Sequence, residues 1–338
     1  MRHLVRHCRA VLAAATVVTL AVAASPAAAQ RGTPPGRAAR RGPLLFVSNE
    51  GGNSLTVLDA RAPHAVVATI PVGTRPRGMA LAPDGRRVYV ALGKDDAVAV
   101  VDVATLAVVD TIPVGQDPEQ VAISPDGRTL YVSNEETSGA TAVDVATKTR
   151  RFSASVGEEP EGVAVLPDGS KLYVTGESSH SVTVIDAASG RVLRSFDVGA
   201  RPRWIAFSRD GRRAYVTSET GGSLSIVNTQ ADSVIGVVQI GDSTRPVGVV
   251  PSRDGRTLYV ALGRAHAVAF VNLARRAVTT RVTVGERPWG IALSPDGTRL
   301  FTADGRAGAV SVLDPRRHKV VARVPVGERP YGVLYVPR

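Results

Sequence analysis

A 42-residue repeat runs through this chain of 338 residues and limits the folds it can adopt. The pair Asp-Gly occurs at Asp84, Asp126, Asp168, Asp210, Asp254 and Asp296, at intervals of 42, 42, 42, 44 and 42 residues. A Gly after Val or Ile recurs seven times with the same period, and a Pro follows it three residues later in all repeats but one. Such regularity indicates a repeat architecture in which each unit is one supersecondary element.

Each repeat is predicted to contain four short strands. In the second repeat, residues 77–82, 87–92, 97–102 and 106–113 form short apolar runs rich in branched residues. Pro83-Asp84-Gly85 is interpreted as a tight turn, because Pro fixes φ and Gly accepts a left-handed backbone. Four antiparallel strands in this length is the period of a β-propeller blade, and no 3.6-residue apolar pattern supports a helical solenoid.

Two recurrent side-chain positions give the number of blades. The second strand carries an aromatic expected to pack between blades: Phe46, Tyr89, Tyr131, Tyr173, Tyr215, Tyr259 and Phe301. The third strand ends in a residue expected to start the next turn by bonding its own backbone: Asp59, Asp102, Asp144, Asp186, Asn228, Asn272 and Asp314.

The two ends of the repeat region complement each other. The region begins at a second strand, residues 44–48, and ends with a lone first strand, residues 331–336. Joining them completes a seventh blade and removes the open sheet edge. The sequence therefore predicts an all-β fold over residues 44–338, a seven-bladed β-propeller of four-stranded antiparallel blades with one blade closed by both termini.

The first 43 residues differ from the repeats. Three Arg precede an apolar stretch at residues 11–23, and small residues ending at Ala29 offer a cleavage site. This pattern predicts a signal peptide at residues 1–29, too short and wrongly flanked for a membrane span. Residues 30–43 are predicted to be a flexible basic leader. The mature chain is expected to be periplasmic or secreted and free of Cys, since Cys8 would be removed.

Familiar catalytic motifs do not occur. The sequence has no His-Glu-x-x-His, no Gly-x-Ser-x-Gly and no phosphate-binding loop. His180 and His266 are expected on one face of the disk, two blades apart, with His64 and His318 on the other. We interpret them as loop residues; a metal-binding or acid–base pair is the alternative. No catalytic residue, metal site or cofactor is therefore predicted. The net charge of +11 is interpreted as surface charge rather than as a nucleic-acid footprint.

The linkers between blades vary from repeat to repeat. In a propeller they lie around one mouth of the central channel, together with the loops between second and third strands. The residues before the linker Pro are Arg75, Asp117, Glu159, Arg201, Arg245, Arg287 and Arg329, and those after it are Arg77, Glu119, Glu161, Arg203, Val247, Trp289 and Tyr331. Acids occupy two adjacent blades and continue as Glu135 and Glu177 in the loops, so the mouth is predicted to be charge-polarised.

This mouth is the candidate binding site. Arg offers paired contacts to carboxylates, and Trp or Tyr offers a stacking face, which favours an anionic or aromatic ligand. The alternative is that neighbouring Arg and Glu only brace the blades. The candidate ligand-binding residues are Arg75, Arg77, Glu119, Glu161, Arg201, Arg203, Arg245, Arg287, Trp289, Arg329 and Tyr331.

Several repeated segments resemble the YVTN family of β-propeller repeat proteins. Leu-Tyr-Val-Ser-Asn at residues 130–134, Ser-Val-Thr-Val-Ile-Asp at 181–186 and the Val-Gly-x-x-Pro endings carry the resemblance. Asp-Pro-Glu at 117–119 and Arg-Pro-Val-Gly at 245–248 are similar to the subgroup associated with quinone-cofactor-dependent (PQQ) alcohol catabolism. The resemblance implies an exported protein without a defined catalytic site.

The leading functional prediction is an exported, non-enzymatic binding or scaffold protein, accessory to PQQ-dependent alcohol oxidation. Its partner would be a small anionic or aromatic ligand or a periplasmic protein, and neither a nucleic acid nor a membrane span is expected. Two alternatives stay open, because a fold does not fix a function. One is a propeller enzyme of the lactonase or lyase type that uses residues on the loop face. The other is a cell-surface adhesion module.

Overall fold

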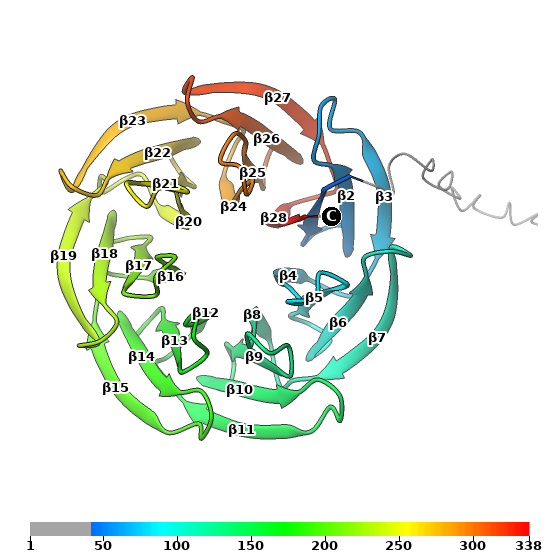
Figure 1. The fold of residues 1–338 in the computed structure, drawn as a ribbon, viewed down its shortest axis with the longest axis vertical. Coiled ribbons are helices and arrows are strands. Elements are labelled where there is room, and N and C mark those ends of the chain that lie inside the picture. Colours follow the sequence, from blue (N-terminus) through cyan, green and yellow to red (C-terminus); the bar gives the residue numbers. More distant parts are fainter. Residues whose placement is uncertain (1–41, 338) are drawn as a thin grey trace, which may run out of the picture. The chain divides into compact units, whose positions relative to one another are not determined.

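The computed structural model describes residues 42–337, and the regular structure within them is entirely β-strand. Its strands form seven four-stranded antiparallel sheets arranged as blades around a common centre (Figure 1). The described part of the chain contains no helix long and apolar enough to span a membrane. The predicted signal peptide, residues 1–29, and the first part of the predicted leader lie outside the described residues.

Each blade is named here by its innermost strand. From inside to outside the blades are β28 (Pro330–Val336), β1 (Leu44–Asn49), β2 (Ser54–Asp59), β3 (Val66–Pro71); β4 (Pro76–Leu81), β5 (Arg87–Leu92), β6 (Ala97–Asp102), β7 (Ala107–Pro113); β8 (Pro118–Ile123), β9 (Thr129–Asn134), β10 (Gly139–Asp144), β11 (Arg150–Ser155); and β12 (Pro160–Val165), β13 (Lys171–Gly176), β14 (Ser181–Asp186), β15 (Val192–Asp197). The other three are β16 (Pro202–Phe207), β17 (Arg213–Ser218), β18 (Ser223–Asn228), β19 (Ser233–Gln239); β20 (Pro246–Pro251), β21 (Thr257–Leu262), β22 (Ala267–Asn272), β23 (Ala277–Thr283); and β24 (Pro288–Leu293), β25 (Leu300–Asp304), β26 (Ala309–Asp314), β27 (Lys319–Pro325).

The two ends of the repeat region meet in one blade, as the sequence predicts. Strand β28 pairs antiparallel with β1, and Leu44 lies opposite Val336 while Val47 lies opposite Val333. Each innermost strand contacts the innermost strands of both neighbouring blades, and β28 contacts β24 and β4. The ring is therefore closed by the chain itself, and the predicted all-β seven-bladed fold is confirmed.

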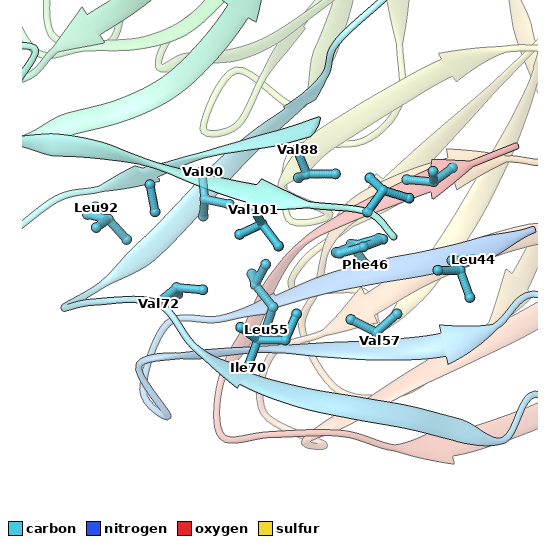
Figure 2. Packing of buried hydrophobic residues seen from close by; sticks show 13 residues of the cluster. Leu44, Phe46, Leu55, Val57, Ile70, Val72, Val88, Val90, Leu92 and Val101 are labelled. Atoms are coloured by element: carbon cyan, nitrogen blue, oxygen red, sulfur yellow. The ribbon is translucent and has the colours of Figure 1, made fainter. Parts of the chain in front are cut away.

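The hydrophobic core is divided among the interfaces between blades. Figure 2 shows one such interface, where Phe46 and Leu55 of the β28 blade pack with Val88, Val90 and other residues of the β4 blade. The recurrent aromatic of the second strand is buried in every blade, as expected. Burying an apolar side chain of this size contributes roughly 1.5–3 kcal/mol, so the repeated position is a main source of stability.

The recurrent Asp and Asn at the end of each third strand cap the following turn. Asp102 Oδ1 accepts the backbone N–H groups of Ala104 and Thr105 at 3.0 and 2.8 Å. Asn228 Oδ1 accepts those of Gln230 and Ala231 at 2.9 Å each. The amide oxygen of Asn thus accepts the same backbone hydrogen bonds as the carboxylate of Asp, and the predicted turn-capping role is confirmed.

Candidate functional site at the mouth of the central channel

Seven linker residues with unusual backbone geometry surround one mouth of the channel. In every blade the residue before the linker Pro has a φ between 42° and 58°, although none of them is Gly. Its carbonyl accepts the N–H of the residue that follows the second strand, as from Glu219 to Arg201 at 2.7 Å. Linker and loop are thus tied together on one face, as predicted. A left-handed backbone is uncommon at residues other than Gly, but it recurs at other turns of this repeat, as at Asp96 and Leu106, so it belongs to the blade geometry.

The residues after the seven Pro form a closed ring, here called the mouth ring. In order around the channel they are Tyr331, Arg77, Glu119, Glu161, Arg203, Val247 and Trp289. Gly follows the ring residue in five blades and lets the inner strands approach closely. A Cβ on Gly162 would lie 2.6 Å from the carbonyl oxygen of Arg203, and one on Gly290 would lie 2.7 Å from that of Tyr331.

Arg203 is surrounded by three carboxylates, and we call these four residues the Arg203 cluster. The guanidinium pairs with Glu161, with Glu177 at 2.5 Å and with Glu219 at 2.8 Å. All four side chains are buried. Burial alone would lower the pKa of Arg203, but Glu161, Glu219 and Glu177 raise it above its usual value, so Arg203 stays charged.

The three carboxylates of the cluster are not equivalent. Burial raises the pKa of Glu177 to about 7, and Glu161 adds to the rise while Arg203 and Arg201 oppose it. At Glu219 burial acts in the same direction, but Arg203, Arg201 and Arg245 together outweigh it and leave the pKa below its usual value. Glu177 therefore changes its protonation near neutral pH while Glu219 stays ionised, the arrangement expected of a general base.

A second group of carboxylates lies beside the first. Oxygens of Asp117, Glu119 and Glu135 lie within 4.8 Å of one another, a spacing that suits a metal ion. The guanidinium of Arg75 reaches all three, at 3.0 Å for Glu119 and 3.8 Å for Glu135, and Arg77 pairs with Glu119 from the other side. Arg75 and Arg77 thus supply the positive charge that balances these carboxylates.

The other half of the mouth ring is aromatic. Trp289 and Tyr331 pack with ring centroids 5.4 Å apart, over Val247. The guanidinium carbon of Arg77 lies 4.8 Å from the Tyr331 ring, and that of Arg203 lies 5.5 Å from the Trp289 ring, within cation–π range. Burial raises the pKa of Tyr331 to about 12, so it keeps its proton.

A cavity of about 880 Å³ opens on this aromatic half, and we call it the mouth cavity. Trp289, Tyr331, Arg77, Arg287, Arg329 and Glu50 are among its lining residues. The loop after the second strand explains its position. That loop carries Glu50, Glu135, Glu177 or Glu219 in four blades but Gly93, Gly263 or Gly305 in the others. Gly305 of the β24 blade lines the cavity together with Trp289, where a Glu side chain at the same loop position would occupy part of the space.

Arg287 differs from the other arginines that precede a linker Pro. Arg201 pairs with Glu177, and Arg245 reaches Glu219 at 3.2 Å. Among the described residues no carboxylate lies within ion-pair distance of Arg287, whose guanidinium carbon lies 4.9 Å from the Trp289 ring. Burial lowers its pKa, and the neighbouring arginines act in the same direction. It is therefore the mouth arginine best placed to receive an anionic group.

The structure brings together most of the residues predicted from the sequence and adds three. The strands that carry the predicted ring residues contact one another in order around the channel. Ligand binding by these residues stays a prediction. Glu50, Glu177 and Glu219 were not among the candidate site residues, although they share one loop position in their repeats. Glu177 was predicted only as part of the acidic sector.

The two histidines on the mouth face, His180 and His266, contact backbone groups and do not form a pair with each other. Nδ1 of His266 accepts the N–H of Arg287 at 3.0 Å. Nδ1 of His180 lies 2.9 Å from the backbone oxygen of Glu177. Each ring thus holds the linker or loop of its own blade junction.

Comparison with known proteins gives a family. The sequence profile of the family described as "Lactonase, 7-bladed beta-propeller" matches residues 17–106 and 192–323, together more than half of the chain. No curated protein matches the sequence significantly.

Solved structures share the fold. The periplasmic gluconolactonase of Pseudomonas aeruginosa is 21% identical, with a TM-score of 0.73 over 87% of this chain and 99% of that one. A Bacteroides fragilis protein provisionally named a 6-phosphogluconolactonase is 17% identical, with a TM-score of 0.73 over 87% and 98%. The Kuenenia stuttgartiensis hydrazine synthase is 26% identical, with a TM-score of 0.72 over 81% and 93%.

The family match corrects the leading functional prediction. A non-enzymatic binding or scaffold protein was expected because no compact catalytic motif occurs in the sequence. That expectation is wrong for a physical reason: the mouth takes one residue from each blade, so its charged groups stand about 42 residues apart and form no local motif. The match favours the alternative of a lactonase-type propeller enzyme. The chain belongs to the seven-bladed β-propeller lactonase family.

Proposed function

We propose that the protein hydrolyses a lactone at the mouth of its central channel. The observation that carries the proposal is the Arg203 cluster, in which Glu177 titrates at about 7 beside a buried guanidinium. Family membership supports the reaction class. The names of the Pseudomonas and Bacteroides proteins suggest the lactone of a sugar acid as the substrate class.

Lactone hydrolysis needs a base and a stabilised oxyanion. Ionised Glu177 takes a proton from water while the water oxygen forms a bond to the lactone carbonyl carbon. The negative charge that develops on the carbonyl oxygen is stabilised by the guanidinium of Arg203. The bond to the ring oxygen then breaks, and the proton held by Glu177 passes to the departing alkoxide. The product is the open hydroxy acid.

The mouth cavity supplies the substrate-binding surface. Sugar rings pack through their C–H faces on aromatic side chains, and Trp289 and Tyr331 offer such a surface. Trp289 lines the cavity and lies beside the Arg203 cluster, because the Arg203 guanidinium contacts both the Trp289 ring and Glu177. Arg287 and Arg329 at the rim would hold a carboxylate or phosphate of the ligand, in line with the anionic ligand predicted from sequence.

The resemblance to the YVTN family and to its PQQ-associated subgroup is consistent with lactone hydrolysis. Similarity to the YVTN family and to the PQQ-associated subgroup rests on the segments quoted above, and export rests on the predicted signal peptide at residues 1–29. Oxidation of the hemiacetal carbon of a cyclic sugar removes two electrons and gives a lactone. A quinone-dependent oxidation in the periplasm would therefore supply the substrate class that we propose.

Replacing Glu177 with Gln is expected to lower kcat for lactone hydrolysis about a hundredfold or more, the usual effect of losing a general base. The pH profile gives a second readout. Because the active form of Glu177 is the carboxylate, wild-type kcat should rise as pH increases through about 7 and level off above it. The measurement is stopped-flow or pH-stat hydrolysis of glucono-1,5-lactone between pH 6 and 8, corrected for spontaneous hydrolysis.

Glu136→Gln is the matched control, because Glu136 lies on the adjoining loop with an exposed side chain. It should keep the wild-type rate and pH profile. A Glu177→Gln protein that hydrolyses lactone at the wild-type rate with the same profile would remove Glu177 from the reaction.

A further inference from the structure

Seven exposed arginines gather on the β16 and β20 blades, on the face opposite the mouth. They are Arg209, Arg212, Arg213, Arg253, Arg256, Arg275 and Arg276. Within residues 42–337 none of them has a carboxylate at ion-pair distance, whereas Arg61, Arg299 and Arg317 on the same face do. Asp210 and Asp254 lie in the same turns and offset part of this charge, so the surface carries a net excess of positive charge.

A comparison of equivalent positions in the repeat shows why these blades carry excess positive charge. In the β4 blade Arg87 at the start of the second strand lies opposite Asp102 at the end of the third. In the β24 blade Arg299 reaches Asp314 at 3.8 Å. In the β16 blade the corresponding partners are Arg213 and Asn228.

The β20 blade likewise has Asn272 at this position. The ring of third-strand acids is thus interrupted only in the two adjoining blades where the arginines accumulate. Asn keeps the turn cap, as described above, so the substitution removes charge without removing structure.

All of these arginines except Arg275 line a row of four cavities that share lining residues. Their volumes are about 650, 270, 450 and 580 Å³. The first two share Arg209, the second and third share Gly255, and the third and fourth share Arg276. Arg213, Arg256 and Arg276 line the third cavity together with Asn272, and no acid lines it, whereas Asp168 and Asp210 line the first. We call this row the basic groove.

We propose that the basic groove binds a linear acidic polysaccharide. A row of cavities fits an extended chain better than a single small anion, and the spaced arginines match charges repeated along such a chain. Gln230 and Thr229 in the first cavity, and Asn272 in the third, offer uncharged partners for sugar hydroxyls. Phe207 is the only aromatic that lines these four cavities, which gives little surface for stacking nucleic-acid bases.

Binding of polygalacturonate, a linear polyuronate, tests the proposal. Titration calorimetry with the full chain at about 0.15 M salt, where exposed charges beyond about 8 Å are screened, should detect binding of this probe but not of neutral dextran. The triple variant Arg213→Gln, Arg256→Gln and Arg276→Gln should weaken binding about tenfold or more. Lactone hydrolysis should not change, because the groove lies on the opposite face from the mouth.

The matched control removes the same charge elsewhere. Arg150→Gln, Arg191→Gln and Arg316→Gln change three exposed arginines of other blades, and they should weaken binding less than about threefold. Equal weakening by both triple variants would mean that net charge alone attracts the polymer. Absence of wild-type binding, or tighter binding of duplex DNA than of polygalacturonate under the same conditions, would overturn the proposal.

Discussion

Replacing Arg203 with Met is expected to destabilise the folded protein by about 3–5 kcal/mol at pH 8, because a buried ion pair loses one partner. The change leaves Glu161, Glu177 and Glu219 buried without the guanidinium that contacts all three. The loss should be smaller at pH 5. Without Arg203 the pKa values of the carboxyls rise in the folded state, so they are protonated there and no longer repel one another. Equilibrium urea unfolding followed by circular dichroism at both pH values measures the effect.

Arg306→Met is the control for this variant. Arg306 also lies at the mouth but is exposed, and no described carboxylate is within ion-pair distance of it. It should change the free energy of unfolding by less than about 0.5 kcal/mol. A similar small effect for Arg203→Met, independent of pH, would show that the three carboxylates do not depend on Arg203.

Deleting residues 329–338 is expected to abolish cooperative folding, the largest effect predicted here. The deletion removes β28, which pairs with β1 along its length and contacts the innermost strands of both neighbouring blades. The β1 edge would be exposed, and unpaired strand edges promote aggregation. Thermal melting by circular dichroism, with light scattering to detect aggregates, measures the outcome.

A shorter deletion separates strand loss from chain shortening. Removing only residues 337 and 338 leaves β28 intact, so this protein should melt within about 2 °C of wild type. If the longer deletion also melted cooperatively near the wild-type temperature, closure by β28 would not be needed for stability.

The fold could be predicted because its determinants repeat. Tyr173 and Tyr215 occupy one strand position, and Asp186 and Asn228 occupy another, so position along the repeat decides whether a residue lies in the core or caps a turn. The repeat region begins at a second strand and ends at a first strand. This offset predicts both the number of blades and the blade that the two termini share. Neither requires the side-chain contacts to be known.

The mouth was harder to predict because charge balance is a three-dimensional property. The linker pattern placed Arg203 in a sector of arginines and left open whether these bind a ligand or pair with neighbouring Glu. The structure shows it neutralised by Glu161 of the neighbouring linker and by two loop residues, Glu177 and Glu219. The positions of Glu177 and Glu219 in their loops do not by themselves show how close the two carboxylates lie to Arg203. The raised pKa of Glu177 depends on burial by neighbouring blades, which no local sequence pattern records.

The proposed enzymatic function could not be read from spacing for the same reason. A catalytic motif is recognisable when its residues share one turn or one helix. Here Glu177 follows the second strand of the β12 blade, Arg203 begins the β16 blade and Trp289 begins the β24 blade. They meet through contacts across the mouth that their spacing in the sequence does not reveal.

Hydrolysis of glucono-1,5-lactone by the purified wild-type protein tests the central claim most directly. Proton release is followed at pH 7 in weak buffer, with the Arg203→Met and Glu136→Gln proteins measured in parallel. We predict turnover well above spontaneous hydrolysis for wild type and Glu136→Gln, and loss of it for Arg203→Met under conditions where that protein remains folded. A wild-type rate equal to spontaneous hydrolysis, for this lactone and for its 6-phosphorylated form, would contradict the assignment of the mouth as a sugar-lactone hydrolase.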